Sequence, residues 1–168
     1  MPPAPRRIVV TDANVLINLI HVNALGLLGS LDGYEFIVVE EVIAEITIAE
    51  QAAALAAAFT NDWAKRETLE DLQSLNLFAE LSAVMGKGEA ASLALAITKR
   101  FDIACDEKRV FRREAVKRLG EHRILTTPGI FVLAIRAGVI TIEQADEAKA
   151  SLAQKRFEMS FTSFRDVV

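Results

Sequence analysis

Short apolar segments rich in β-branched residues alternate with longer helical segments along most of the chain, and this alternation constrains the fold more than any other feature. The short segments are bounded by glycine or polar residues, which is typical of buried strands. Strands are predicted at residues 7–11, 36–39, 101–105 and 123–125. Helices are predicted at residues 15–28, 41–59, 72–85, 89–99, 107–119 and 128–136.

Parallel strands need crossover connections, usually helices, and these crossovers are right-handed. The order of the elements therefore predicts an α/β fold, a mostly parallel sheet flanked by helices in three layers. The 168 residues fit one domain with a core over about residues 7–140. A C-terminal helix is expected to begin after Thr141, because Gln144 follows three residues later as in a capping box. An extended or partly ordered tail is expected from Phe157.

The composition is that of a soluble globular protein, with 52% apolar and 25% charged residues. The single cysteine, Cys105, cannot form an internal disulfide, and residues 1–7 lack the apolar stretch of a secretory signal. No apolar run approaches the ~20 residues that a membrane-spanning helix needs. We therefore expect a cytoplasmic protein with no membrane role.

The net charge of −4 argues at first against a nucleic-acid partner, because binding a polyanion usually requires a basic surface. One segment is nevertheless basic at helical spacing, and it contains Lys108, Arg109, Arg112, Arg113, Lys117 and Arg118. This segment fits a phosphate-binding surface and an ordinary solvated helix face equally well.

Two aspartates stand directly after predicted strands, Asp12 after residues 7–11 and Asp106 after residues 101–105. Ligands of open parallel sheets bind beyond the carboxyl ends of the strands, so both residues are candidates for chemistry. Each also precedes a predicted helix, and helix N-capping is the simpler explanation for either residue alone.

Two glutamates join them near predicted helix starts on the same side of the sheet. Glu45 lies about one turn into the helix after the second strand, and an exposed helical glutamate is its simpler explanation. Glu89 follows Gly86 and Gly88 and opens a helix that is too apolar to begin in open water.

Four carboxylates brought together in one crevice repel one another unless a cation or protons neutralise them. The nitrogen and sulfur donors of the chain, His21, His122 and Cys105, show no zinc-site spacing. The combination therefore predicts an oxygen-ligand site for Mg²⁺ or Mn²⁺.

Four motifs in order resemble those of the PIN-domain family. They are IVVTDANVL at residues 8–16, VIAEI at 42–46, GKGEAA at 86–91 and ACDE at 104–107. The likeness extends more weakly to residues 128–129 and 138–140, so it covers nearly the whole chain. Any one motif occurs in many folds, whereas all four in this order are specific.

The resemblance implies a Rossmann-like sheet, metal-dependent hydrolysis of RNA, homodimerisation and, as in the toxins of many bacterial pairs, an antitoxin partner. Asp12, Glu45, Glu89 and Asp106 match the catalytic acidic quartet, of which Asp12, Glu89 and Asp106 are expected to hold Mg²⁺ or Mn²⁺. Asn14 matches the supporting polar residue. Glu107 adjoins Asp106 and is an alternative to it or a second metal contact. It is ranked lower because the residue at the strand end is expected to point into the crevice and its neighbour to turn away.

Arg109, Arg112 and Arg113 are the candidates for contact with the RNA backbone. Two other functions are compatible with parts of the sequence. A PIN fold without catalysis would bind only RNA or a protein, although such domains usually lose one or more of the carboxylates. A phosphatase of the haloacid dehalogenase class would use Asp12 as nucleophile, but the second acid of its loop is replaced by Asn14.

Overall fold

A computed structural model describes residues 1–106 and 109–168. Its centre is a sheet in which all four strand pairings are parallel, in the order β3-β2-β1-β4-β5. The strands are β1 (Arg7–Thr11), β2 (Tyr34–Val39), β3 (Lys65–Glu67), β4 (Asp102–Ala104) and β5 (Ile124–Leu125).

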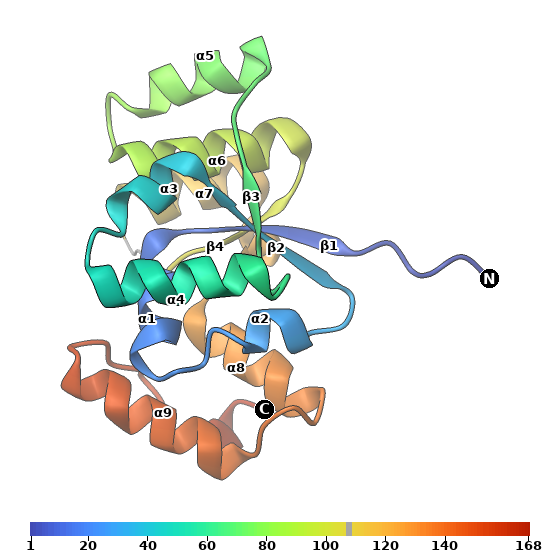
Figure 1. Cartoon of the computed structure of the whole chain (residues 1–168), viewed down its shortest axis with the longest axis vertical. Coiled ribbons are helices and arrows are strands. Elements are labelled where there is room, and N and C mark those ends of the chain that lie inside the picture. The colour runs from blue at the N-terminus through green and yellow to red at the C-terminus, as the bar shows by residue number, and fades with distance from the viewer. Residues whose placement is uncertain (107–108) are drawn as a thin grey trace.

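Helices cover both faces of this sheet, which confirms the predicted three-layer α/β/α architecture (Figure 1). One layer contains α5 (Leu72–Leu81), α6 (Lys87–Lys99) and α7 (Val110–Leu119). The other contains α1 (Ala13–His21), α2 (Leu27–Ser30), α4 (Ala49–Thr60), α8 (Thr127–Arg136) and α9 (Ile142–Gln154). The short helix α3 (Glu40–Glu45) follows β2 directly and packs on α6.

Helix α6 is the most enclosed helix of its layer because it packs on β1, β2 and β4 and lies between α3, α5 and α7. Its residues from Ala90 to Ala96 are all buried. This explains why α6 is apolar on nearly every side rather than amphipathic. The first turn of α6 is thereby fixed against the sheet.

The direction in which successive strands are added to the sheet reverses between β1 and β4, and this place is the topological switch point of the sheet. From β1 the chain proceeds outward to β2 and β3, then returns through α5 and α6 to β4 on the other side of β1, and continues to β5. The connections on the two sides of β1 therefore run over opposite faces, and the carboxyl ends of β1 and β4 border a crevice. This is the position at which a Rossmann-like sheet binds its ligands.

The structure divides two predicted helices. The helix expected at residues 15–28 ends at His21, because Asn23 adopts a left-handed conformation with φ of 53°, and α2 begins later. The helix expected at residues 41–59 is interrupted by residues 46–48, which are not helical and separate α3 from α4. The first break contains Asn23 and Gly26, which are residue types common at helix ends. The second break contains neither glycine nor proline, so residue type alone did not reveal it.

Two features of the periphery were not predicted. Residues 65–67 form the edge strand β3, although all three are charged and exposed, because an edge strand of this kind needs only backbone pairing with β2. The C-terminal segment is not an extended tail throughout, since it ends in the 3₁₀ helix η2 (Phe164–Asp166), whose Phe164 is fully buried.

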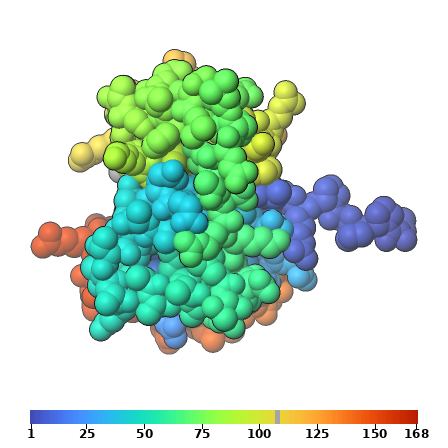
Figure 2. Space-filling model, turned by 45° about the horizontal axis from the view of Figure 1, so that its top comes forward, coloured from blue at the N-terminus to red at the C-terminus, as the bar shows by residue number. Residues whose placement is uncertain are grey.

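The other predicted elements agree closely with the structure. The helix expected at residues 107–119 begins at Val110 in the described residues, and α9 carries the capping box between Thr141 and Gln144. No helix in residues 1–106 and 109–168 is long and apolar enough to cross a membrane. The first residues of the chain extend away from the body of the molecule (Figure 2).

Candidate functional site

Asp12 lies at the centre of the candidate site, at the carboxyl end of β1. Its backbone N–H donates to the carbonyl of Ala104, at 3.0 Å, which places it beside the end of β4. The residue is only 1% exposed. It occupies the N-cap position of α1, but its carboxylate makes no capping hydrogen bond, and its Oδ2 has no hydrogen-bond partner in the described chain. Helix capping therefore does not explain this aspartate.

Burial raises the pKa of Asp12 to about 7. The N–H groups of Ala13 and Asn14 act in the opposite direction, because they favour the charged carboxylate. The negative charges of Glu89 and Glu45 raise the pKa further. Three carboxylates of the predicted quartet are thus close enough to interact electrostatically, and the one at the centre is in a poor environment for its charge.

Glu45 is fixed by the first turn of α6. It is the last residue of α3, and its Oε1 accepts a hydrogen bond from the backbone N–H of Gly88 at 2.8 Å. A Cβ atom on Gly88 would lie only 2.5 Å from Oε2 of Glu45. Residue 88 must therefore be glycine for Glu45 to reach the helix end. The sequence shows this glycine only as a helix break, and its partner could not be predicted from it.

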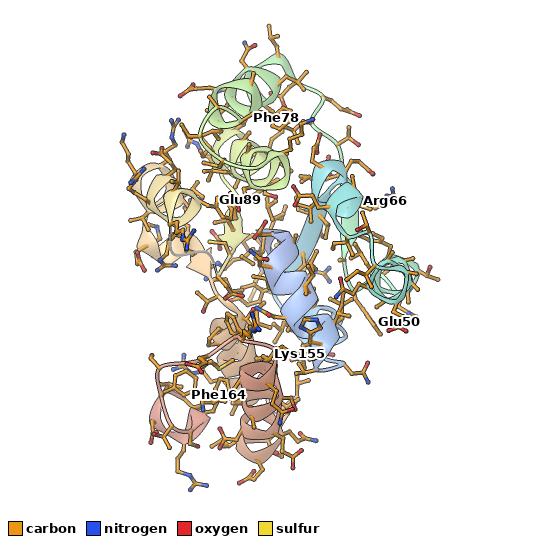
Figure 3. The ribbon with its side chains drawn as sticks, turned by 90° about the vertical axis from the view of Figure 1, so that its left-hand side faces the viewer. Glu50, Arg66, Phe78, Glu89, Lys155 and Phe164 are labelled. Carbon is orange, nitrogen blue, oxygen red and sulfur yellow. The ribbon has the colours of Figure 1, made fainter. Side chains whose placement is uncertain are left out.

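Glu89 follows Gly88 in the first turn of α6 and is half-buried. It lies on the face at which the strands end, as seen in Figure 3. A carboxylate in this turn is favoured by the positive end of the helix dipole, which offsets part of its repulsion from Asp12.

Asp106 follows β4 and is held by a different set of donors. Its Oδ1 accepts from the backbone N–H of Thr127 at 2.8 Å, and its Oδ2 accepts from the Thr127 hydroxyl at 2.5 Å. The side-chain amide of Asn18 donates to the same Oδ2 at 3.0 Å. Since Thr127 is the first residue of α8, Asp106 caps the start of that helix.

Asn18 and Thr127 are the polar partners that sequence reasoning missed. Asn14 was expected to support the acidic residues, but the amide that contacts Asp106 belongs to Asn18, one turn further along α1. Asn14 is exposed and lines the same hollow as Asp106, so its supporting role stays a prediction. The available indication in the sequence was an asparagine among the apolar residues of a predicted helix, at a position that is buried in the structure.

Asp12, Glu45 and Glu89 thus interact at the end of β1, and Asp106 stands at the end of the neighbouring strand. Within residues 1–106 and 109–168, no three His, Cys, Asp or Glu side chains already form a metal-binding group. The donor chemistry nevertheless fits a hard divalent cation, since the buried Oδ2 of Asp12 lacks a partner and negative charges surround it. Glu107, the alternative to Asp106, lies outside the described residues.

The predicted RNA-contacting arginines have different environments. Arg112 pairs with Glu121 and lines a hollow beside Asp106. Arg109 and Arg113 are both exposed, Arg109 just before α7 and Arg113 within it. Contact of these arginines with RNA stays a prediction.

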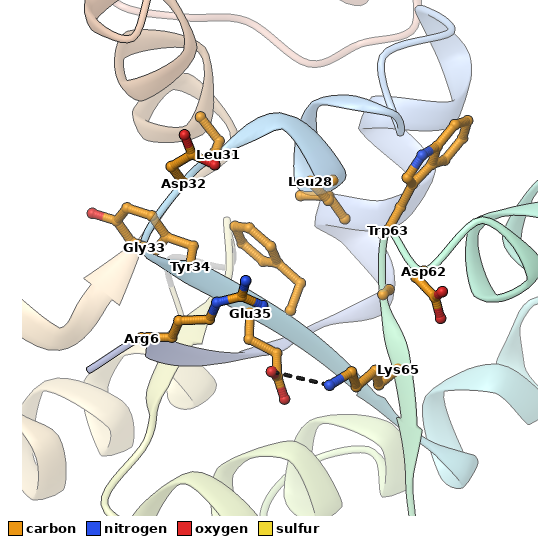
Figure 4. A pocket seen from close by; sticks show the side chains of 13 residues that line it. Arg6, Leu28, Leu31, Asp32, Gly33, Tyr34, Glu35, Asp62, Trp63 and Lys65 are labelled. Atoms are coloured by element: carbon orange, nitrogen blue, oxygen red, sulfur yellow. Dashed lines mark hydrogen bonds and ion pairs between the residues drawn. The ribbon is translucent and has the colours of Figure 1, made fainter. Parts of the chain in front are cut away.

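A separate hollow of about 90 Å³ lies on the opposite side of the sheet from the candidate site, at the amino ends of β2 and β3 (Figure 4). Trp63 and the ion pair between Lys65 and Glu35 form part of its wall. Because the predicted acidic residues lie at the carboxyl ends of the strands, this hollow does not belong to the candidate site.

The raised pKa of Asp12 predicts a defined pH dependence of stability in the absence of divalent cations. Between about pH 4 and pH 7 the unfolded chain loses the Asp12 proton while the folded protein keeps it, so the free energy of unfolding falls as the pH rises. Asp12→Asn removes this fall. A shift of one pKa unit corresponds to ~1.4 kcal/mol, so the free energy of unfolding of Asp12→Asn is expected to rise by a few kcal/mol relative to that of the wild type between about pH 4 and pH 7. Above about pH 7 this difference is expected to stay constant.

Urea unfolding in EDTA at several pH values measures this difference, and Asp32→Asn, at an exposed aspartate, is the matched control. Any cost of burying the asparagine amide is independent of pH and leaves the slope unchanged. A difference between Asp12→Asn and wild type that stays constant from pH 4 to pH 7 would contradict the assignment.

A family model described as a PIN domain matches residues 8–168 of the chain. Searches of curated proteins and of solved structures returned no match. The matched residues include all four predicted carboxylates, and the PIN fold is in general a nuclease fold that depends on divalent metal. The parallel sheet, its switch point and this match together show that the chain belongs to the PIN-domain family.

Proposed function

We propose that this protein is an endoribonuclease that hydrolyses RNA phosphodiester bonds with the help of Mg²⁺ or Mn²⁺. The single observation that carries the proposal is the buried Asp12 carboxylate, which has an unpartnered oxygen and two further carboxylates acting on it. Such an arrangement is unfavourable by itself and becomes favourable with a bound cation. The position at the switch point of a parallel sheet supports the same conclusion.

Asp12, Glu89 and Asp106 would hold the cation. A bound Mg²⁺ or Mn²⁺ supplies Lewis acidity and neutralises the charge that develops during phosphodiester hydrolysis. Asn18 and Thr127 hold Asp106 by donating to its carboxylate, so its oxygens are positioned before substrate binds. The hydrogen bond from Gly88 fixes Oε1 of Glu45, and Glu45 would orient the attacking water through its other oxygen.

The family resemblance extends this proposal to a cytoplasmic protein that forms a homodimer and is paired with an antitoxin protein. A second candidate is a PIN fold that binds RNA or a protein without cutting. The retention of all four carboxylates favours catalysis over this candidate.

Cleavage of mixed cellular RNA in Mn²⁺ tests the proposal directly. Wild-type protein is expected to cut, and EDTA is expected to stop it. Loss of an outer partner of a metal ligand usually costs ~10–100-fold in activity, so loss of a ligand itself is expected to cost at least about 100-fold. Asp12→Asn and Asp106→Asn are therefore expected to be nearly inactive, whereas Asp32→Asn, at an exposed site, cuts at the wild-type rate.

RNA that is bound but left uncut by wild-type protein with Mn²⁺ would favour the non-catalytic candidate. Wild-type rates for either Asp12→Asn or Asp106→Asn would remove that residue from the site. An acid-stable phosphoryl group on Asp12 would instead indicate a phosphatase of the haloacid dehalogenase class.

Two neighbouring glycines offer a matched pair for testing the role of Glu45. Gly88→Ala is expected to displace the Glu45 carboxylate, because its Cβ would lie 2.7 Å or less from three atoms of that group. Stability should change little, since the end of a flexible side chain can move aside and alanine favours the helix. The cleavage rate is expected to fall by about 10-fold or more.

Gly86→Ala is the control, because a Cβ at Gly86 meets nothing within 4 Å. It is expected to cut RNA at close to the wild-type rate, with at most the small stability cost of alanine at an N-cap. Equal activity of the two variants would show that the contact between Gly88 and Glu45 does not matter for cleavage.

A further inference from the structure

Two hollows meet at Asp106, and residues 155–161 form a wall of both. We call these residues the C-terminal wall. The first hollow, of about 240 Å³, is lined by Asn14, Asn18, Asp106, Lys155, Arg156 and Phe157, among others. The second, of about 430 Å³, is lined by Asp106 together with Pro128, Phe157, Met159 and Phe161, among others. Asp106 and Phe157 therefore border both hollows.

The C-terminal wall is held at both ends although it contains no helix or strand. At its start, Arg156 adopts a left-handed conformation with φ of 64°, and the N–H of Phe157 donates to the carbonyl of Leu152 at 3.0 Å. At its end, the ring of Phe161 packs edge-on against the buried Phe164, with 4.9 Å between centroids. The wall is therefore a defined surface beside Asp106.

Asp146 secures the anchor at Phe164. Its carboxylate accepts hydrogen bonds from the Ser163 hydroxyl at 2.6 Å and from the Phe164 N–H at 2.8 Å. These bonds favour the charged carboxylate and lower the pKa of Asp146. The ring of Phe164 also packs against Phe131 of α8, which connects the wall to the helix whose start is capped by Asp106.

The two hollows differ in chemistry. Lys155 and Arg156 line the first, and both are exposed. Neither side chain makes a hydrogen bond or an ion pair with the described part of the chain. The second offers the apolar surfaces of Phe157, Met159 and Phe161, with Glu158 and Arg112 also at its lining. A cationic surface and an apolar ring surface side by side match the phosphate and the base of a nucleotide. Lys155 lies on the same face of the molecule as Glu89 (Figure 3).

We propose that the C-terminal wall binds single-stranded RNA beside the cleaved bond, with Lys155 and Arg156 on the phosphates and an unstacked base on Phe157 in the apolar hollow. This inference rests on the proposed nuclease function and adds a substrate-binding surface to it. A hollow of about 430 Å³ is within the usual size of small-ligand sites. Because a base in a duplex stays stacked, the wall selects unpaired RNA.

Fluorescence anisotropy with a labelled single-stranded RNA of ten nucleotides, in EDTA to prevent cutting, tests this inference. Phe157→Leu keeps the apolar bulk but removes the ring, and it is expected to weaken binding by about 5- to 100-fold, the range for loss of one base–aromatic stack. Phe157→Tyr keeps the ring and is expected to bind like wild type. The same RNA annealed to its complement is expected to bind wild type more weakly than the single strand and to be insensitive to Phe157→Leu.

Lys155→Gln is expected to weaken binding and to lower the slope of log affinity against log salt by about 1, as loss of one phosphate contact does. Arg136→Gln is the control, because Arg136 is an exposed cation at the end of α8 and does not belong to the C-terminal wall. It is expected to leave the affinity and the salt slope nearly unchanged. Equal weakening by Lys155→Gln and Arg136→Gln would contradict a specific role for the wall.

Cleavage assays with Mn²⁺ on the same proteins separate the two proposals. If wild type cuts RNA and Phe157→Leu binds and cuts as well as wild type, the C-terminal wall has no role in binding and the nuclease function stands. If wild type cuts no RNA while Phe157→Leu still loses affinity for single strands, the nuclease function fails and the binding surface stands. Wild-type affinity that is equal for single strand and duplex would overturn the selection of unpaired RNA.

Discussion

The burial of the Asp12 carboxylate is the constraint on which the site depends. A buried carboxylate without a partner for one oxygen is costly, and Glu45 and Glu89 add to that cost through their charges. The fold places Asp12 there because β1 is the central strand and its carboxyl end borders the switch point with β4. Stability is thereby reduced at the position where a cation would restore it, as is common at functional sites.

Helix N-termini make the surrounding negative charge tolerable. Asp12 precedes α1, Glu45 accepts a hydrogen bond from the first turn of α6, and Asp106 accepts one from the first residue of α8. Each helix start presents backbone N–H groups and the positive end of its dipole. Three helices from distant parts of the chain therefore begin in one region. The partial positive charges at their N-termini offset only part of the negative charge of the carboxylates.

The central features of this arrangement could be predicted from the sequence, whereas the contacts between distant segments could not. Asp12 directly follows β1, and Asp106 comes two residues after the end of β4. The carboxyl ends of parallel strands lie on one side of the sheet, so the placement of both residues follows from local pattern. The contact of Glu45 with Gly88 and that of Asn18 and Thr127 with Asp106 join residues far apart in sequence. No periodicity encodes such pairs, because they depend on how α3, α1 and α8 pack.

The errors in the predicted elements have the same origin. Strand β3 is charged throughout and forms because β2 offers an open edge. Residues 46–48 interrupt a helical pattern directly after Glu45, the last residue of α3, which contacts the first turn of α6. The C-terminal segment looked like a tail because its anchors, Asp146 and Phe131, lie elsewhere in the sequence. Tertiary contacts therefore decide the elements that complete the site.

The central claim, that Asp12 belongs to a cation site, is tested most directly by the melting temperature with and without Mn²⁺. A ligand at 100 times its dissociation constant stabilises the folded state by about 2.7 kcal/mol, so saturating Mn²⁺ is expected to raise the melting temperature of wild type by several degrees. Asp12→Asn is expected to lose most of this increase and Asp32→Asn to keep it. An increase of equal size in Asp12→Asn and wild type would contradict the account.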